Sequence, residues 1–351
     1  MSTWVASAPG KVVLLGEYAV LDGAPALVQA VNRRCTVRLS LCAQDHARIE
    51  AVQLGNATIR FAFDELGQLR WQDGFPPGFE RTADVIESVL QYGRERGAAI
   101  RPFAMRIDSG PLFSGSNKLG LGSSGAVAVA VDAALRAAFL DHKAGDSGDE
   151  LPRQTVGRLR AVAGSARPGA GSGIDLAASL CGGTLEFRLA GSQVELKPVQ
   201  LPRDLALFYV WAGEPASTCE LLAAWRQAAK IRPDEHRRLL EAMKTLAEEG
   251  RQAAQHADAA ALMGAMAGYG CIMSKMNRLT GHEIVTAEHR RAAAVVSELG
   301  GVYKPCGAGG GDIGVAAFSR PGPAAHLRSR LPESMLTDLK PDRRGVYVQQ
   351  E

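Results

Sequence analysis

The chain is 351 residues long, which suits two domains or one large domain, and its 40 Lys and Arg against 37 Asp and Glu give a formal net charge of +3 at pH 7. Hydrophobic residues make up 46% and charged residues 22%, which is ordinary for a soluble globular protein and excludes disorder over most of the length. The balanced charge provides no basic surface for nucleic acid or an anionic membrane, so neither partner is expected. No apolar run could span a bilayer and no signal-peptide pattern follows Met1, so we expect a cytoplasmic protein, either a monomer or a homodimer.

Short apolar runs bounded by Gly and Pro predict a strand-rich first half. The predicted strands are Thr3–Ala8, Val12–Leu15, Ala26–Val31, Cys35–Cys42, Ala47–Val52, Thr58–Phe63 and Phe103–Ile107. Cys35–Cys42 alternates polar and apolar residues, and we expect Ala47–Val52 and Thr58–Phe63 to pair with it. The predicted helices are Thr82–Arg96, Ala126–Leu140 and Leu151–Ala163.

A hairpin of Thr184–Arg188 and Gln193–Lys197 is expected to close the first domain, at residues 1–200. The segment Pro198–Arg203 contains two prolines, Pro198 and Pro202, and marks the boundary to a second domain, residues 201–351. The second half is predicted to contain a strand at Ala206–Ala212, helices over about 218–231, 234–276 and 286–299, strands at Val302–Lys304 and Ile313–Phe318, a helix at Pro323–Leu331 and a strand at Val346–Val348. A break near Gly250 is expected in the longest helix. These elements predict a two-domain α+β fold.

The segment from Lys118 to Ala126, with the sequence KLGLGSSGA, carries the strongest chemical signal. Its glycines let backbone N–H groups approach a ligand closely, and the helix that follows adds a partial positive charge. Serine hydroxyls can bind phosphate oxygen or a magnesium ion. The pattern therefore predicts a phosphate-binding loop, against the alternative of a simple glycine-rich turn in which Ser124 caps the helix.

The same residues, Gly120–Gly125, also match the G-x-G-x-x-G pattern of dinucleotide-binding proteins. That motif should follow a strand by a tight turn, whereas here the loop from Ser109 to Leu119 intervenes. We therefore rank a dinucleotide-dependent oxidoreductase below a phosphate-binding enzyme. The other common phosphate motif, G-x-x-x-x-G-K-[ST], is absent from the sequence.

Two further glycine-rich segments flank predicted strands. In Ser7–Val20, Lys11 follows Pro9 and Gly10, and the neighbouring glycines favour a site over an ordinary solvated lysine. In Lys304–Asp312, a run of Gly and Ala residues can form a backbone nest for an anion, with a plain connecting loop as the alternative.

Together the three segments resemble the GHMP kinases, and the resemblance covers nearly the whole chain with the motifs in the family's order. It implies a two-domain fold with a cleft between the domains, and ATP bound over the second motif without a Walker lysine. Several segments are most similar to the phosphomevalonate kinase branch, namely Gly16–Leu21, Lys118–Gly125, Gly171–Ala178, Trp211–Thr218 and Gly307–Gly314. The branch implies mevalonate 5-phosphate as the acceptor, with mevalonate or another polar metabolite as the alternative.

The resemblance also implies roles for individual residues. Lys11 and Asp175 would be catalytic, and Ser124 would hold Mg²⁺. Residues implied to bind ATP are Lys118, Gly120, Gly122, Ser123, Ser124, Gly125 and Ala126. Residues implied to bind the acceptor are Lys11, Glu17, Tyr18, Gly173, Ser217, Thr218, Ala308, Gly309 and Gly310, with Arg167 as a further candidate cation.

Two departures from the family pattern stand out. Some relatives carry a metal-binding glutamate before the catalytic aspartate, whereas residues 163–167 here contain no carboxylate. Cys306 stands where related kinases often have serine. A non-catalytic binding protein with the same fold is a further alternative, against which the presence of Lys11, Ser124 and Asp175 counts.

Overall fold

The computed structural model describes residues 2–115, 117–140, 150–166, 171–191, 193–213, 217–320, 322 and 324–351. These residues form a nine-stranded sheet, a three-stranded sheet, a two-stranded hairpin and helices that cover them, which confirms the predicted α+β class. Within these ranges, no helix combines the length and hydropathy that a membrane crossing requires. The six cysteines are free thiols.

The large sheet has the strand order β10-β9-β2-β6-β3-β4-β5, and β1 pairs with both β2 and β14. Its strands are β1 (Thr3–Leu15), β2 (Ala26–Leu41), β3 (Arg48–Ala51), β4 (Ala57–Phe63), β5 (Leu69–Trp71), β6 (Phe103–Asp108), β9 (Thr184–Ala190), β10 (Gln193–Pro198) and β14 (Tyr347–Gln350). The expected pairing of β3 and β4 with the second half of β2 is wrong, because β6 lies between β2 and β3. The chain returns through a helix before it adds β6, so strands that are neighbours in sequence are not neighbours in the sheet.

Strands β1 and β2 are each continuous where the sequence predicts two shorter runs. Pro9 and Gly10 lie inside β1 at a shift in the register with β2. A bulge tolerates proline, which has no N–H to donate to the ladder, so these residues bend the strand without ending it. From Ala6 onward nearly every residue of β1 is buried, as expected for a strand covered on both faces.

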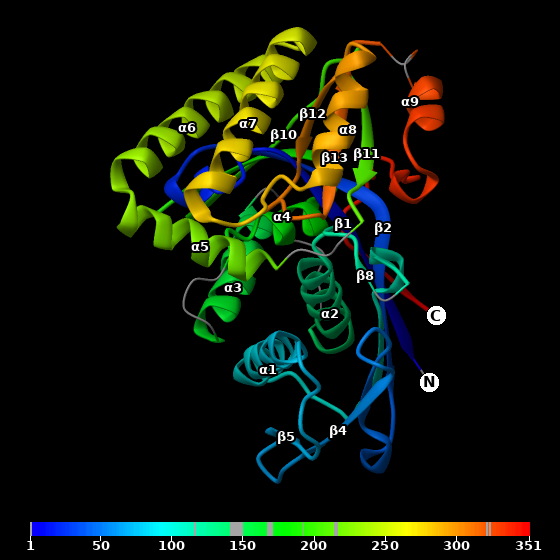
Figure 1. Ribbon diagram of the computed structural model, residues 1–351. Coiled ribbons are helices and arrows are strands. Elements are labelled where there is room, and N and C mark those ends of the chain that lie inside the picture. Colours follow the sequence, from blue (N-terminus) through cyan, green and yellow to red (C-terminus); the bar gives the residue numbers. More distant parts are fainter. Residues whose placement is uncertain are drawn as a thin grey trace.

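Four helices pack in the first half, with α2 and α4 against β1 and β2. They are α1 (Glu80–Glu95), α2 (Ser123–Phe139), α3 (Glu150–Ala166) and α4 (Ile174–Cys181). Figure 1 shows α1 beneath α2 in the lower part of the molecule, beside the extension that carries β4 and β5. Helix α2 begins earlier than the predicted Ala126, because Gly122 in a left-handed conformation caps it.

The second half places helices around the sheet β11-β13-β12. Its elements are β11 (Ala206–Trp211), α5 (Thr218–Ile231), α6 (Pro233–Gln255), α7 (Ala259–Thr280), α8 (Ala287–Glu298), β12 (Val302–Pro305), β13 (Ile313–Phe318) and α9 (Ala324–Arg330). The predicted break near Gly250 is wrong: Gly250 lies within α6, and the chain turns at Ala257, whose φ is 56°. Asp258 then caps α7 by accepting a hydrogen bond from the Ala261 N–H at 2.9 Å.

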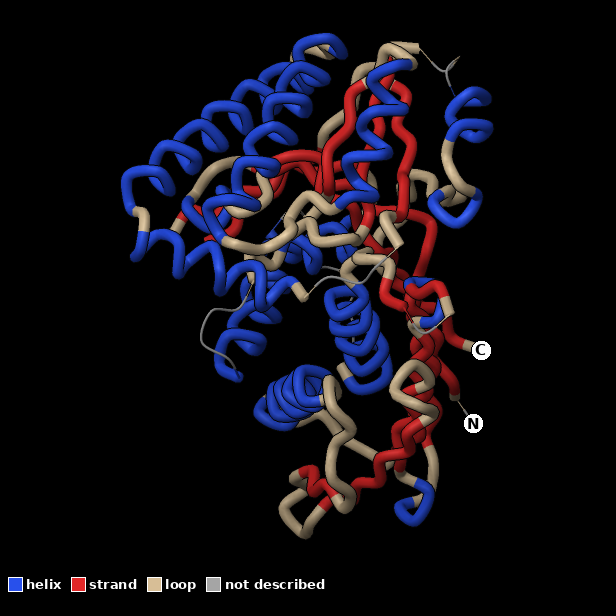
Figure 2. Tube along the Cα trace, in the orientation of Figure 1, coloured by secondary structure: helices blue, strands red, loops and turns tan. Residues whose placement is uncertain are grey.

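The C-terminal strand returns to the first sheet. β14 pairs with β1 in antiparallel register, Trp4 opposite Gln350, so the two ends of the chain lie side by side (Figure 2). Arg34 binds the segment that leads into β14. Its Nη1 donates to Asp342 Oδ2 at 2.5 Å, and its Nη2 donates to the carbonyl oxygen of Gly345 at 2.7 Å.

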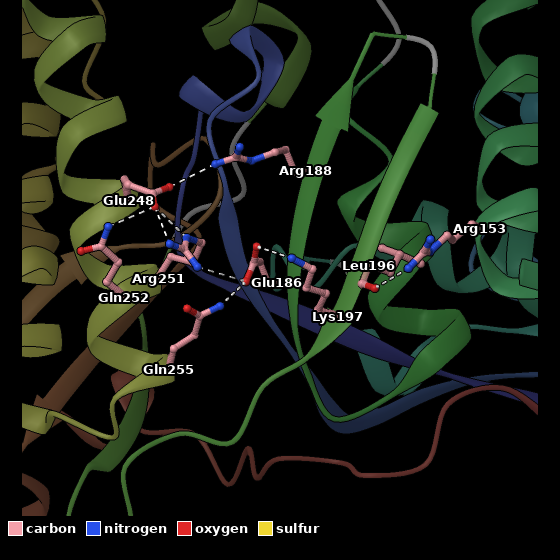
Figure 3. A network of polar contacts seen from close by, with 9 residues as sticks. All are labelled: Arg153, Glu186, Arg188, Leu196, Lys197, Glu248, Arg251, Gln252 and Gln255. Atoms are coloured by element: carbon pink, nitrogen blue, oxygen red, sulfur yellow. Dashed lines mark hydrogen bonds and ion pairs between the residues drawn. The ribbon is translucent and has the colours of Figure 1, made fainter. Parts of the chain in front are cut away.

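A polar network joins the β9–β10 hairpin to α6, as Figure 3 shows. Arg188 donates to Glu248 at 3.0 Å, and Gln255 donates to the buried carboxylate of Glu186 at 3.3 Å. Arg251 donates to Glu248 at 2.5 Å and lies 3.9 Å from Glu186. The two halves of the chain are therefore linked by charged groups as well as by apolar packing.

Candidate active site

The second glycine-rich segment forms the turn that leads into α2. Gly120 and Gly122 have φ values of 73° and 71°, in the left-handed region that favours glycine. The Ala126 N–H donates to the Gly122 carbonyl at 3.1 Å, so the helix starts at Ser123. The first amides of a helix have no acceptor within the helix, and its dipole favours an anion there. This turn therefore has the geometry of a phosphate-binding loop.

Lys11 contacts this turn from β1. Its backbone N–H donates to the Leu121 carbonyl at 2.8 Å, and its Nζ donates to the Gly120 carbonyl at 3.1 Å. The close approach requires Gly10, because a Cβ at that position would lie 2.9 Å from the Leu121 oxygen. A Cβ on Gly122 would lie 3.0 Å from Lys11 Cε. The lysine side chain therefore runs along the glycine turn.

Asp175 reaches the same turn from α4. It lies in the first turn of that helix, after Gly173, whose φ is 83° and which caps the helix. A carboxylate in a first helical turn is stabilised by the helix dipole. A Cβ on Gly125 would lie 2.6 Å from Asp175 Oδ2, and a Cβ on Gly122 would lie 3.3 Å from Asp175 Cβ. Asp175 and Lys11 therefore both border the start of α2, although they are far apart in sequence.

The third glycine-rich segment closes on the same place. Gly307, Gly309 and Gly310 have φ values of 66°, 77° and 78°, and the Gly310 N–H donates to the Ile284 carbonyl at 2.8 Å. A Cβ on Gly307 would lie 3.8 Å from Lys11 Nζ. Successive left-handed glycines can present their amides to an anion. The loop therefore passes near the ammonium group of Lys11, but the Gly309 and Gly310 amides are already bound, to the carbonyls of Cys306 at 3.4 Å and of Ile284 at 2.8 Å.

Asp312 is a residue of this region to which the sequence analysis gives no role. A Cβ on Gly120 would lie 2.4 Å from Asp312 Cγ, so the carboxyl group packs directly against the glycine turn. Its side chain is largely buried, at 8% exposure. The signal was available, because an acidic residue directly follows the glycine run of the third segment.

Glu17 and Tyr18 are buried beside the third segment. Lys304 Nζ donates to Glu17 Oε1 at 2.5 Å, and the two side chains are 0% and 2% exposed. Burial raises the pKa of the Glu17 carboxyl, and the charge of Lys304 opposes that rise. The Tyr18 hydroxyl donates to the Ala308 carbonyl at 2.7 Å. Glu17 Oε1 and the Tyr18 hydroxyl are bound within the protein, and the predicted role of the two residues in acceptor binding stays a prediction.

A cavity of about 100 Å³ opens beside the first turn of α2. Arg81, Lys118, Ser123 and Ser124 form part of its polar wall, and Leu54 belongs to its apolar wall. Lys118 is carried by a short hairpin of β7 (Phe113–Ser114) and β8 (Asn117–Lys118). Arg81 Nη1 donates to Ser124 Oγ at 2.8 Å. The sequence analysis misses Arg81, because nothing local distinguishes it from a solvated arginine on a helix.

The start of α2 also fits the Mg²⁺ that the family resemblance implies. Ser124 offers an exposed hydroxyl, and the carboxylate of Asp175 borders the next residue, Gly125. Mg²⁺ is commonly held by one or two carboxylates together with substrate phosphates and water. The described part of the chain has no cluster of three His, Cys, Asp or Glu side chains that could hold a metal alone. An ion at Ser124 would therefore depend on oxygens of the nucleotide.

The remaining predicted acceptor-binding residues lie at the start of α5. Ser217 is exposed and caps this helix by accepting a hydrogen bond from the Glu220 N–H at 3.4 Å, and Thr218 is the first helical residue. Their role in binding stays a prediction. Arg167 lies outside the described residues.

The alternative of a dinucleotide-binding fold finds no support in the topology. The residues that match the dinucleotide motif follow the two-residue strand β8, which pairs only with β7 among the described strands. In the large sheet, the described pairs are antiparallel except β3 with β6. A dinucleotide site needs a parallel β-α-β unit with the glycines directly after its first strand, and the motif here lies outside one.

The arrangement suits phosphoryl transfer. The Lys11 ammonium group, the carboxyl groups of Asp175 and Asp312, and two glycine-rich turns converge at the start of α2. Phosphoryl transfer needs precise placement and neutralisation of negative charge more than covalent chemistry by the protein. Amides and a lysine that are already in place can stabilise the charge of a transferring phosphoryl group without reorganisation.

Comparison with known proteins identifies similar chains. The family model for the GHMP kinases N terminal domain matches residues 83–183. Phosphomevalonate kinase from Streptomyces sp. (strain CL190) is 31% identical over 90% of this chain and 89% of its own length, and mevalonate kinase from Thermococcus sibiricus is 31% identical over 71% and 69%. The structure of Streptococcus pneumoniae phosphomevalonate kinase in complex with phosphomevalonate and AMPPNP has a TM-score of 0.75 and 20% identity, covering 96% of this chain and 99% of that one.

Proposed function

Because this chain belongs to the GHMP kinase family, we propose that it transfers the γ-phosphoryl group of ATP to the phosphate of mevalonate 5-phosphate, giving ADP and mevalonate 5-diphosphate. The coarser conclusion, a phosphotransferase of the mevalonate-kinase type, rests on both groups of relatives. The observation that carries the proposal is that Lys11 and Asp175 both border the glycine turn at the start of α2.

Each part of the site has a role in this reaction. The amides of Gly120–Gly125 bind the phosphates of ATP, since the Ala126 N–H is bound to the Gly122 carbonyl, and the cavity beside α2 accepts the nucleoside. An oxygen of the acceptor attacks the γ-phosphorus while the bond to the bridging oxygen breaks, and ADP leaves. Lys11 stabilises the negative charge that is shared during this exchange. Mg²⁺ bound at Ser124 would neutralise charge on the β- and γ-phosphates.

The acceptor is proposed from the relatives. The phosphomevalonate kinase from Streptomyces aligns over 90% of this chain, whereas the mevalonate kinase from Thermococcus aligns over 71%. Mevalonate itself is the second candidate acceptor, because the phosphomevalonate kinase and the mevalonate kinase are equally identical to this chain, at 31%. A phosphorylated acceptor needs cations in the site, and Lys11 and Lys118 supply them.

The acceptor also decides how much Asp175 contributes. An alcohol must lose a proton, whereas a phosphomonoester has a second pKa near 6 and is mostly ionised at pH 7. We expect Asp175→Asn to lower kcat/KM by about 10²–10⁴-fold for mevalonate and by a smaller factor for mevalonate 5-phosphate. Steady-state kinetics with both acceptors measure the two losses, with Lys11→Met as a variant that should affect both alike. Equal losses for Asp175→Asn would contradict this role.

An ADP-release assay with a panel of acceptors tests the proposal. The panel contains mevalonate 5-phosphate, mevalonate, homoserine and galactose, each with ATP and Mg²⁺. We expect ADP release with mevalonate 5-phosphate at a kcat/KM at least tenfold above the others. Preferential release with mevalonate would replace the proposed acceptor with the second candidate. If the protein binds ATP but turns over none of these acceptors, the conclusion would be a non-catalytic binding protein with the same fold.

A further inference from the structure

We propose that Arg81, on α1, binds the polyphosphate of the nucleotide directly. This inference rests on the proposed ATP-dependent function and adds a residue that lies outside the three glycine-rich segments. Arg81 reaches the start of α2 from a neighbouring helix and donates from Nη1 to Ser124 Oγ at 2.8 Å. Its guanidinium group therefore lies at the turn that is shaped for phosphate.

The hydrogen bonding of Arg81 is incomplete. Its bond to Ser124 is its one hydrogen bond within the described part of the chain, and it forms no ion pair there. Its Nε is shielded from solvent and has no hydrogen-bond partner among the residues that the structure describes. A buried donor without a partner is costly, and a guanidinium has five N–H donors in a planar fork. The side chain therefore retains donors for a ligand.

The charge of the surrounding cavity points to an anion. The residues that line it include two cations, Arg81 and Lys118, and no Asp or Glu within the described ranges. Ser123 and Ser124 add hydroxyl groups, and the first amides of α2 add the positive end of a helix dipole. A polyphosphate would neutralise both cations, and arginine can bind two of its oxygens at once.

The cavity also has an apolar part, which a simple inorganic anion would leave uncovered. Leu54, Phe79 and Val127 line the same space as Arg81. A ligand that contacts the whole lining would combine an apolar group with negative charge. A nucleoside triphosphate has this chemistry, and Arg81 lines the same cavity as the apolar residues while it contacts Ser124.

Binding of ATP, ADP and adenosine, measured by calorimetry on the whole protein without acceptor, tests the proposal. Arg81→Met keeps most of the side-chain volume and removes the charge. We expect it to weaken ATP binding about tenfold or more and adenosine binding less than twofold. Arg81→Lys should give an intermediate loss, because it keeps the charge and loses the planar fork.

Arg94→Met is the matched control. Arg94 is also on α1 and donates to the Gly67 carbonyl at 2.9 Å, outside the cavity lining. It should leave ATP binding within twofold of the unaltered protein. Thermal unfolding of Arg81→Met and Arg94→Met establishes that both variants fold. An ATP affinity in Arg81→Met equal to that in Arg94→Met would overturn the proposal, as would an equal loss of ATP and adenosine binding.

A double-substitution cycle with Ser124→Ala separates direct binding from an effect through Ser124. If Arg81 contacts phosphate, Arg81→Met should still weaken ATP binding at least fivefold in the Ser124→Ala background. If Arg81 only orients the serine, the second substitution should add nothing, and the proposal fails.

The outcomes also separate this inference from the proposed function. Turnover of an acceptor together with unchanged ATP affinity in Arg81→Met would reject the role of Arg81 and keep the kinase. ATP binding that depends on Arg81, without turnover on any acceptor, would keep the role of Arg81 and reject the kinase. An unaltered protein that binds no ATP would reject both.

Discussion

The ion pair between Glu17 and Lys304 shows what a single interaction contributes in this protein. Its two charges lie 2.5 Å apart with almost no exposure to solvent, and they join the first glycine-rich segment to the third. We expect Glu17→Leu to lower the free energy of unfolding by about 3–5 kcal/mol, because it leaves the Lys304 ammonium buried without a partner. Urea unfolding measures the change.

The double variant Glu17→Leu/Lys304→Met is the control for this pair. Replacing both charges with apolar side chains of similar size removes the unpaired charge, so most of the lost stability should return. A double variant that is less stable than Glu17→Leu would contradict this explanation. The kcat/KM of the double variant then measures how much the ion pair contributes to positioning the third glycine-rich segment for the reaction.

His289 makes stability depend on pH in a predictable direction. Burial, together with the nearby charge of Lys304, lowers its pKa to about 4, from 6.5 in the unfolded chain. As the pH falls below 6.5, the unfolded chain binds a proton that folded His289 does not. Stability should therefore fall between pH 6.5 and pH 4, by about 3 kcal/mol at most from this group. Urea unfolding at a series of pH values measures the slope.

His289→Asn should flatten that slope, because asparagine does not titrate and can still hydrogen-bond to the Tyr303 hydroxyl, which lies 2.8 Å from His289 Nδ1. His282 is exposed, so His282→Asn should leave the slope unchanged. An unchanged slope in His289→Asn would assign the pH dependence to other groups.

At the scale of an element, α6 shows why a glycine can persist inside a helix. A Cβ on Gly250 would lie 2.2 Å from Leu15 Cδ1, so the helix packs against β1 at this glycine. Alanine is the better helix former by about 1 kcal/mol, but the clash should outweigh that gain. We expect Gly250→Ala to lower the melting temperature and to destabilise the protein by about 1–3 kcal/mol.

Gly264 in α7 provides the matched comparison. A Cβ there would meet nothing within 4 Å, so alanine adds helix propensity without a clash. Gly264→Ala should raise stability by about 0.5–1 kcal/mol. If both glycine substitutions shifted the melting temperature in the same direction, packing against Leu15 would not be the reason for Gly250.

At the scale of the whole molecule, the C-terminal segment leaves the second half of the chain and joins the first sheet, where β14 pairs with β1. Arg34 is the anchor: besides Asp342 and Gly345, it donates to the Ser7 carbonyl at 2.9 Å and to the Arg344 carbonyl at 3.0 Å. We expect Arg34→Met to destabilise the protein by about 2–4 kcal/mol and to speed proteolytic cleavage in residues 336–346. Chemical unfolding and limited proteolysis measure these effects.

Arg38→Met is the control for the anchor. Arg38 pairs with Glu351 at 2.6 Å, but both side chains are about half exposed, at 50% and 53%. An exposed ion pair contributes roughly 0–1 kcal/mol, so this variant should unfold and be cleaved almost as the unaltered protein does. Equal effects of the two substitutions would show that Arg34 is not the anchor.

Local signals made much of the fold and part of the site predictable. Gly120 and Gly122 were recognisable because a turn with left-handed residues before a helix needs glycine. The predicted break between α6 and α7 was misplaced. Gly250 is needed for close packing against Leu15, whereas the residue that indicates the true turn is Asp258, the N-cap of α7. Arg81 was missed as a site residue, because its contact with Ser124 exists only in the folded chain.

The sequence by itself determined the α+β class, the three glycine-rich segments and the residues of the family motifs. Each of these depends on backbone conformation or side-chain pattern within a few neighbouring residues. Only the tertiary structure decided that β6 separates β2 from β3, that β14 returns to β1, and that Arg81 meets Ser124. Those contacts join residues that are distant along the chain, and their energy comes from burial and charge pairing that exist only after the chain has packed.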